Sequence, residues 1–192
     1  VSPRSQQQQE QEDVLAPGVP GAKFIQLQVL FVLVFVVPLI AVAAPFLFMG
    51  NPETLSDDQA AIFGLVIIGS YGLFLVCMFV YTIISYIYLY RGWLCIQGLP
   101  GVQSTPGKAI GMLFVPFYNI YWIFIAFSGW AKDYNRFCTE RGVNYFPRAN
   151  EGLFMAFCVC AIVFPIITPF LHLACMSQMC KAINFTTGNP SK

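Results

Sequence analysis

Four long runs of hydrophobic residues, separated by short polar stretches, dominate the pattern of this chain. An α-helix rises ~1.5 Å per residue, so crossing a ~30 Å hydrocarbon core takes roughly 20 apolar residues. The pattern therefore predicts an all-α integral membrane protein, a bundle of four transmembrane helices kinked by proline. The predicted spans are about 27–49, 60–90, 109–131 and 152–180.

The polar stretches set the predicted domain boundaries. Residues 1–23 are rich in glutamine and proline and cannot bury a core, so they are interpreted as a disordered tail or linker. They lack the apolar core of a signal peptide. Residues 24–185 form the predicted four-helix membrane domain, and 186–192 form a polar tail. Because the chain begins with valine, we expect it to be a fragment.

The second run, 60–90, is 31 residues long and uncharged. It exceeds one bilayer thickness but is too short for two spans, which predicts one long tilted helix ending near Tyr90 and Arg91. Thr54 or Ser56 is the predicted N-cap. Small residues in the first half would let another helix approach closely. The candidate helix-packing residues are Ala60, Gly64, Gly69 and Gly72, together with Pro116 of the third run.

The third run contains "FVPFYNIYWIF", 114–124, in which a proline and an amide interrupt an apolar segment. Proline removes a donor and clashes with the carbonyl four residues earlier. Two structures fit. The favoured one is a continuous helix kinked at Pro116, and the alternative is an irregular entry over 109–115 followed by a helix beginning at Pro116.

Asn119 then falls near the predicted bilayer midplane, where its amide needs a partner inside the bundle. Tyr118 and Trp122 lie within a turn of it. His172, the only histidine, lies in the fourth run and completes a candidate intramembrane polar site. Packing and registry is one interpretation of the Asn119 group, and the lining of a substrate or lipid groove is the other. For His172 the alternatives are a proton relay or ligand contact and an imidazole bonded to a carbonyl freed by Pro169.

Charged residues follow the third run directly, within "KDYNRFCTERG", 132–142, which is predicted to continue the helix into water with Gly142 as its cap. Asp133 and Arg136, and Arg136 and Glu140, are spaced as helix-surface pairs. A solvated face is the default interpretation. Contact with a lipid headgroup or a partner is the alternative, with Asp133, Arg136 and Arg141 as the candidate contacts.

Composition adds little chemistry to this picture. The 192 residues are 57% hydrophobic and 10% charged, with a formal net charge of +1 that gives no electrostatic reason to expect nucleic acid as a partner. The seven cysteines are interpreted as small packing residues rather than a redox pair, since Cys158 and Cys160 do not face each other on a helix. Neither a catalytic constellation nor a cofactor or metal motif is present, so none is predicted.

The segment "GMLFVPFYN", 111–119, has the pattern G-x-x-x-x-P-F-x-N. It resembles the signature of an uncharacterised bacterial four-pass membrane-domain family, in which the motif opens the third span after a loop with glycine and proline. That family continues with Trp, a basic residue, Pro and Tyr, where this chain has "IYWI". The resemblance covers roughly 24–185 and implies the fold but no activity. Some similar proteins carry a soluble domain before the linker, which implies such a domain upstream of residue 1.

Three functions fit the sequence. A non-catalytic membrane module, meaning an anchor, accessory subunit or oligomer-forming scaffold, fits best. A small transporter or channel around Asn119 and His172 is the first alternative, and a membrane enzyme acting on lipid is the second. The expected partners are the lipid bilayer and other membrane protein chains. The expected location is the bacterial inner membrane, with both termini placed in the cytoplasm by a small excess of Lys and Arg.

Overall fold

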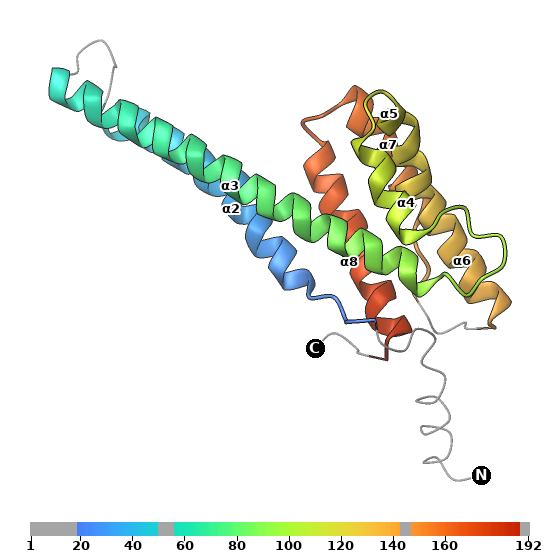
Figure 1. Ribbon diagram of the computed structural model, residues 1–192. Helices are drawn as coiled ribbons and strands as arrows, with labels where there is room; N and C mark the ends of the chain where they lie inside the picture. The colour runs from blue at the N-terminus through green and yellow to red at the C-terminus, as the bar shows by residue number, and fades with distance from the viewer. Residues whose placement is uncertain (1–18, 50–55, 143–146, 189–192) are drawn as a thin grey trace, which may run out of the picture. The chain divides into compact units, whose positions relative to one another are not determined.

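The structure is a computed structural model that describes residues 19–49, 56–142 and 147–188. In these ranges the chain is helical and contains no strand (Figure 1). Most of the predicted tail 1–23, part of the turn 50–59 and the end of the tail 186–192 lie outside the described residues. The chain divides into two units. Unit 2 is Ile25–Ser85, and unit 1 is the remainder, which includes Tyr86–Lys192.

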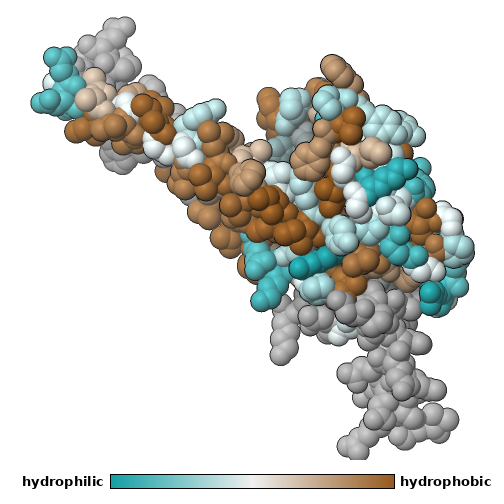
Figure 2. All heavy atoms as spheres, in the orientation of Figure 1, coloured by the Kyte–Doolittle hydropathy of each residue, from teal (hydrophilic) through white to brown (hydrophobic). Residues whose placement is uncertain are grey.

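Unit 2 contains helix α2, Phe24–Met49, except its first residue, and the part of α3, Asp57–Cys95, that ends at Ser85. The helix α2 continues through Pro38 and Pro45. The first turns of α2 lie beside residues 80–84 of α3, so the two helices run in opposite directions. Brown, hydrophobic residues cover much of this pair in the space-filling view (Figure 2).

The helix α3 is 39 residues long and uninterrupted, which confirms the single long helix predicted over 60–90. Ser56 is its N-cap: Gln59 N–H donates to Ser56 Oγ (3.4 Å), and Ser56 N–H donates to Gln59 Oε1 (3.1 Å). Within the described residues, α3 is the one helix that is both long and apolar enough to cross a membrane. The four-span bundle is therefore not confirmed.

The third run is broken rather than kinked. Helix α4, Pro106–Gly111, and a 3₁₀ turn η2, Met112–Phe114, precede the break. After it come α5, Tyr118–Ile123, the π-helical η3, Phe124–Gly129, and α6, Trp130–Glu140. The predicted kinked helix is wrong, and so is the irregular entry of the alternative, because 106–114 is helical. The alternative's late helix start is close to the observed Tyr118.

A tight turn at Phe117 causes the break. Tyr118 N–H donates to the Pro116 carbonyl at 2.7 Å, and Phe117 between them has φ 62°. This is a classic γ-turn, a rare and strained conformation for a residue other than glycine. The chain reverses here, so α4 and α5–η3–α6 form a helical hairpin, hairpin A. Trp122 Nε1–H donates to the Ala109 carbonyl across it (3.1 Å).

The fourth run is also a hairpin, hairpin B, and the single span predicted over 152–180 is wrong. Helix α7 covers Glu151–Val163 and α8 covers Thr168–Thr186. Asn150 N–H donates to Gln178 Oε1, and Cys175 Sγ donates to the Leu153 carbonyl, so the helices are antiparallel. Pro165 and Pro169 lie in and just after the turn between them, where each removes an N–H that would extend a helix.

Unit 1 packs the end of α3 against these hairpins. Its largest fully buried side chains are aromatic, and Trp93 Nε1–H donates to the Ala126 carbonyl at 3.0 Å. All seven cysteines are free and six are buried, as expected of packing residues. Gly92 is buried where α3 comes close to the side chains of Met179 and Trp130. A Cβ at this position would lie 3.0 Å from Met179 and 3.1 Å from Trp130 Nε1.

The predicted boundaries of both tails need correction. Ala22 was placed in the polar tail but is only 5% exposed, and its N–H and C=O both bond the side chain of Asn184 (2.7 and 2.9 Å). Thr186 was placed in the other tail but is fully buried at the end of α8. Tyr88 Oη donates to the Lys23 carbonyl, and Arg91 donates to the Gly21 carbonyl. Side chains of α8 and α3 therefore fix a piece of chain that composition alone assigns to solvent.

Candidate functional site

An aromatic group occupies the start of α5, where sequence predicted part of a polar site. Tyr118 stacks on Trp122 with ring centroids 5.5 Å apart, and Tyr121 lies 5.7 Å from Tyr118. Trp122 is buried, and Lys108 places its ammonium 5.4 Å from the Trp122 ring. Lys108 was not among the predicted site residues, although a lysine beside an aromatic belt is a recognisable membrane-interface signal.

Asn119 is exposed on the surface of α5, so its predicted position inside the bundle is wrong. Its backbone N–H bonds the Val115 carbonyl, but its side-chain amide makes no hydrogen bond among the described residues. The cause is the γ-turn at Phe117: it reverses the chain just before Asn119 and places this residue near an end of unit 1 rather than in the middle of a helix.

His172 lies in hairpin B, apart from Asn119. Its ring is packed against Phe157 and Phe127, with centroids 5.3 and 5.8 Å away. The predicted polar site therefore separates into an exposed amide on α5 and a histidine among aromatic rings, and the structure does not join them in one contact.

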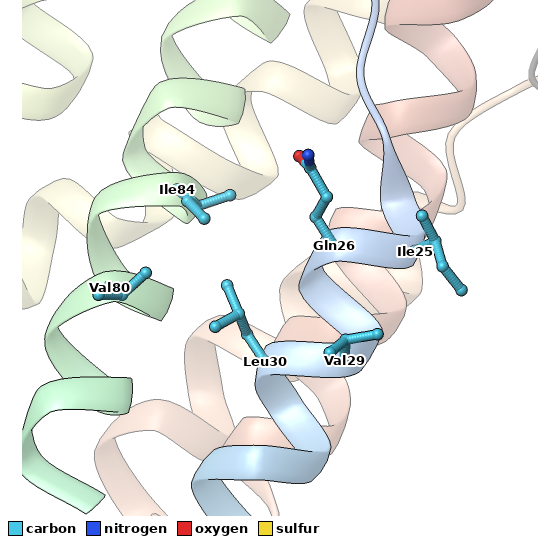
Figure 3. Close-up of a pocket in the computed structure, with 6 residues that line it drawn as sticks. All are labelled: Ile25, Gln26, Val29, Leu30, Val80 and Ile84. Atoms are coloured by element: carbon cyan, nitrogen blue, oxygen red, sulfur yellow. The ribbon is translucent and has the colours of Figure 1, made fainter. Parts of the chain in front are cut away.

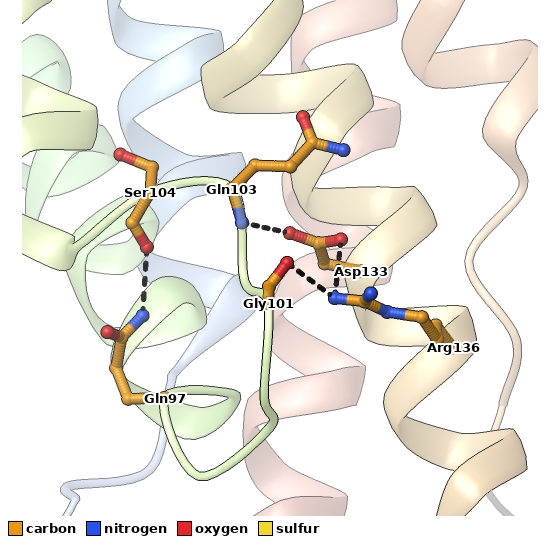
Figure 4. Close-up of polar contacts among 6 residues, drawn as sticks. All are labelled: Gln97, Gly101, Gln103, Ser104, Asp133 and Arg136. Carbon is orange, nitrogen blue, oxygen red and sulfur yellow. Dashed lines mark hydrogen bonds and ion pairs between the residues drawn. The ribbon is translucent and has the colours of Figure 1, made fainter.

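The predicted charged face of α6 is partly a structural clamp (Figure 4). Asp133 is only 4% exposed and accepts from Gln103 N–H at 2.8 Å. Arg136 pairs with Asp133 at 3.3 Å and donates to the Gly101 carbonyl at 2.9 Å. The default interpretation of a solvated face is wrong for Asp133: the carboxylate fastens loop 96–105 to α6. We name Asp133, Arg136, Gly101 and Gln103 the loop clamp.

Arg136 thus forms its predicted pair with Asp133 but turns to the loop instead of Glu140. Arg141 is exposed and rests over the Phe137 ring, 5.6 Å from its centroid. Gly142 ends the helix with φ 65°, as predicted for the cap. The sequence could not reveal Gln103 and Gly101, because they contribute backbone atoms from a loop some thirty residues away.

Replacing Asp133 by leucine is expected to lower the free energy of unfolding by about 1–3 kcal/mol, because the Gln103 N–H loses its acceptor. Asp133→Asn keeps one acceptor oxygen and is expected to lose less. Denaturant unfolding in detergent measures both. Glu140→Gln, an exposed position on the same helix, is the matched control. Equal losses for Asp133→Leu and Glu140→Gln would contradict the clamp.

The small residues predicted to pack on α3 face open space. A Cβ added at Gly64, Gly69 or Gly72 would meet nothing within 4 Å, and Ala60 is exposed. Their predicted close contact with another helix is thus not made by the described part of this chain.

A shallow groove of about 400 Å³ lies between α2 and α3 within unit 2 (Figure 3). Five aliphatic side chains and one amide line it. The lining residues are Ile25, Gln26, Val29, Leu30, Val80 and Ile84. A groove this apolar suits a hydrocarbon chain or an apolar side chain, and it offers no group for acid–base or nucleophilic chemistry.

Chemistry elsewhere in the described ranges is sparse. No group of three or more His, Cys, Asp or Glu side chains there could hold a metal ion. Burial raises the pKa of the Tyr134 hydroxyl and of the neighbouring Cys138 thiol above their ordinary values. Both groups are therefore neutral near pH 7, which makes neither an activated nucleophile.

Comparisons with protein-family models, with curated proteins and with solved structures found no match for this chain. The resemblance carried by residues 111–119 therefore stays a prediction.

Proposed function

We propose that this chain is a non-catalytic integral membrane module: an anchor, accessory subunit or oligomer-forming scaffold. The observation that carries the proposal is the surface of α3. Its apolar side chains face outward over most of its length, with Leu65 71% and Phe79 68% exposed. At ~1.5 Å per residue, its 39 residues measure ~58 Å, enough to cross a ~30 Å hydrocarbon core and project beyond it.

The open small-residue surface of α3 supports the oligomer-forming role. Gly64, Gly69 and Gly72 leave its backbone uncovered, and in membranes such surfaces let helices of two chains approach closely. The transporter alternative needs Asn119 and His172 in one polar path, and their separate surroundings do not support it.

The test is extraction of membranes from cells that express the full chain. We expect the protein to stay in the membrane pellet through alkaline carbonate and high salt, and to need detergent for release. A protein recovered as a monodisperse species without detergent would overturn the proposal.

A matched pair of variants assigns the anchoring to α3. Val76→Arg places a charge on its exposed apolar surface, where insertion costs about 2.5–3.5 kcal/mol near the bilayer centre. Gln59→Arg places the same charge in the first turn of the helix, where it remains in water. We expect Val76→Arg to reduce the fraction of the protein that stays in the membrane pellet through carbonate and high salt. We expect Gln59→Arg to leave that fraction unchanged.

A further inference from the structure

The turns of hairpins A and B are apolar and exposed. Phe117 is 88% exposed and Ile166 is 85% exposed. Six further apolar residues of the two turns are exposed as well. These residues are Phe114, Val115, Val163, Phe164, Ile167 and Phe170. We name the turns 114–118 and 163–170 the hairpin tips.

The two tips lie at the same end of unit 1. Asn135 bonds the Ala149 carbonyl, Trp130 contacts Phe154 (5.4 Å), and Cys158 Sγ donates to the Ile123 carbonyl (3.4 Å). Lower numbers on α5–η3–α6 thus pair with higher numbers on α7. Continuing that register brings the start of α5 level with the end of α7, and Figure 1 shows both turns at one end of the unit.

Backbone donors in and beside the tips are bonded at six positions, whereas the N–H groups of Phe117, Ile166 and Thr168 have no backbone acceptor among the described residues. In hairpin A, the N–H groups of Val115, Tyr118 and Asn119 are bonded, and Pro116 has none. In hairpin B, those of Phe164, Ile167 and Phe170 are bonded. Pro165 and Pro169 have no N–H to satisfy. The unbonded N–H groups of Phe117 and Ile166 need water or a lipid headgroup as acceptor, so in a membrane the turn backbones belong at the headgroup level and only the apolar side chains reach hydrocarbon.

The side chains change from apolar to partly polar from the last residue of the hairpin A tip, Tyr118, onward. Tyr118, Tyr121 and Trp122 follow Phe117 on α5, and Lys108 extends over the Trp122 ring. Aromatic residues with polar atoms, backed by lysine, are typical of the level where a bilayer meets water.

We propose that the apolar side chains of the hairpin tips insert together into the outer acyl layer of a membrane, with the turn backbones at the headgroup level, so that the chain enters and returns on the same side. The 13 residues of α7 measure ~20 Å, less than the ~30 Å hydrocarbon thickness. This inference rests on the proposed membrane location and adds a second lipid contact to that of α3. The aromatic residues and Lys108 behind the tips favour lipid over a second copy of the chain as the occupant.

The experiment uses the full chain in phosphatidylcholine vesicles, with p-benzoylphenylalanine replacing Phe117 or Ile166 in separate proteins. Both side chains are exposed, so neither replacement disturbs packing. Phe185 is the control position: it is 42% exposed and lies in the last turns of α8, at the opposite end of hairpin B. After irradiation, mass spectrometry identifies each adduct.

We expect phospholipid adducts, attached through the acyl chain, at positions 117 and 166. We expect no such adduct at the control position 185. Cross-linked dimers at the tips would assign them to a second copy and overturn the inference. Equal adducts at all three positions, or none at the tips, would overturn it as well. If the protein stays in the membrane pellet through carbonate but gives no lipid adduct at positions 117 and 166, this inference alone is overturned. If the protein leaves the membrane without detergent, the proposed function is overturned.

Discussion

Replacement of Trp93 by alanine is expected to lower the free energy of unfolding by about 3–5 kcal/mol, the range for removing a fully buried large aromatic side chain. Trp93 is fully buried in the core of unit 1. The loss includes its Nε1–H bond to the Ala126 carbonyl. Alanine leaves a cavity that Gly92, the preceding residue, cannot help to fill. The measurement is denaturant unfolding in detergent.

Leu94→Ala is the matched control, because Leu94 is the next residue on α3 and is 37% exposed. It removes a hydrophobic side chain from the same helical turn without opening a buried cavity, so a distinctly smaller loss is expected. Similar losses for Trp93→Ala and Leu94→Ala would contradict the position of Trp93 in the core.

The sequence predicted α3 well because length and composition determine it. A run of 31 uncharged residues contains no proline, and the Ser56 cap and the Gly142 end follow from local chemistry. Such features depend on residues within one or two turns of each other. The confirmed predictions in this chain are all of that kind.

Hydropathy could not show that the third and fourth runs reverse direction. A sum over hydrophobic residues does not distinguish one helix of 29 residues from two that meet at a turn. The signal lay in the prolines. Pro165 and Pro169 lie four residues apart in the middle of 152–180, where the turn and the start of α8 are now seen.

The residues of the candidate polar site lie in separate surroundings for a related reason. The placement of that site assumed that Asn119 sits halfway along a continuous helix, and the γ-turn at Phe117 removes that assumption. The loop clamp could not be predicted from the sequence either, and neither could the tether, meaning the bonds between the Asn184 side chain and the backbone of Ala22. In both, a side chain bonds backbone atoms from a distant part of the chain, and no spacing rule in the sequence points to such a pair.

Replacing Asn184 by leucine is expected to have the second-largest effect. The Asn184 amide donates to the Ala22 carbonyl and accepts from its N–H, and all of these groups are buried. Leucine has a similar size but no polar atom. Each buried backbone group left unpaired costs about 1–3 kcal/mol, and partial opening of the segment to water relieves some of that cost, so a loss of about 2–4 kcal/mol is expected in unfolding measurements.

A matched control is Thr187→Val, three residues later, where the hydroxyl only bonds carbonyls of its own helix. It is expected to change the free energy of unfolding little. If the Ala22 segment detaches in Asn184→Leu to regain water, trypsin should cleave after Lys23 faster than in the wild type. Tyr88 and Arg91 also hold this segment, through Lys23 and Gly21, and would limit how far it opens. Unchanged stability together with unchanged cleavage in Asn184→Leu would contradict the tether, because two buried backbone groups cannot lose their partners without either cost.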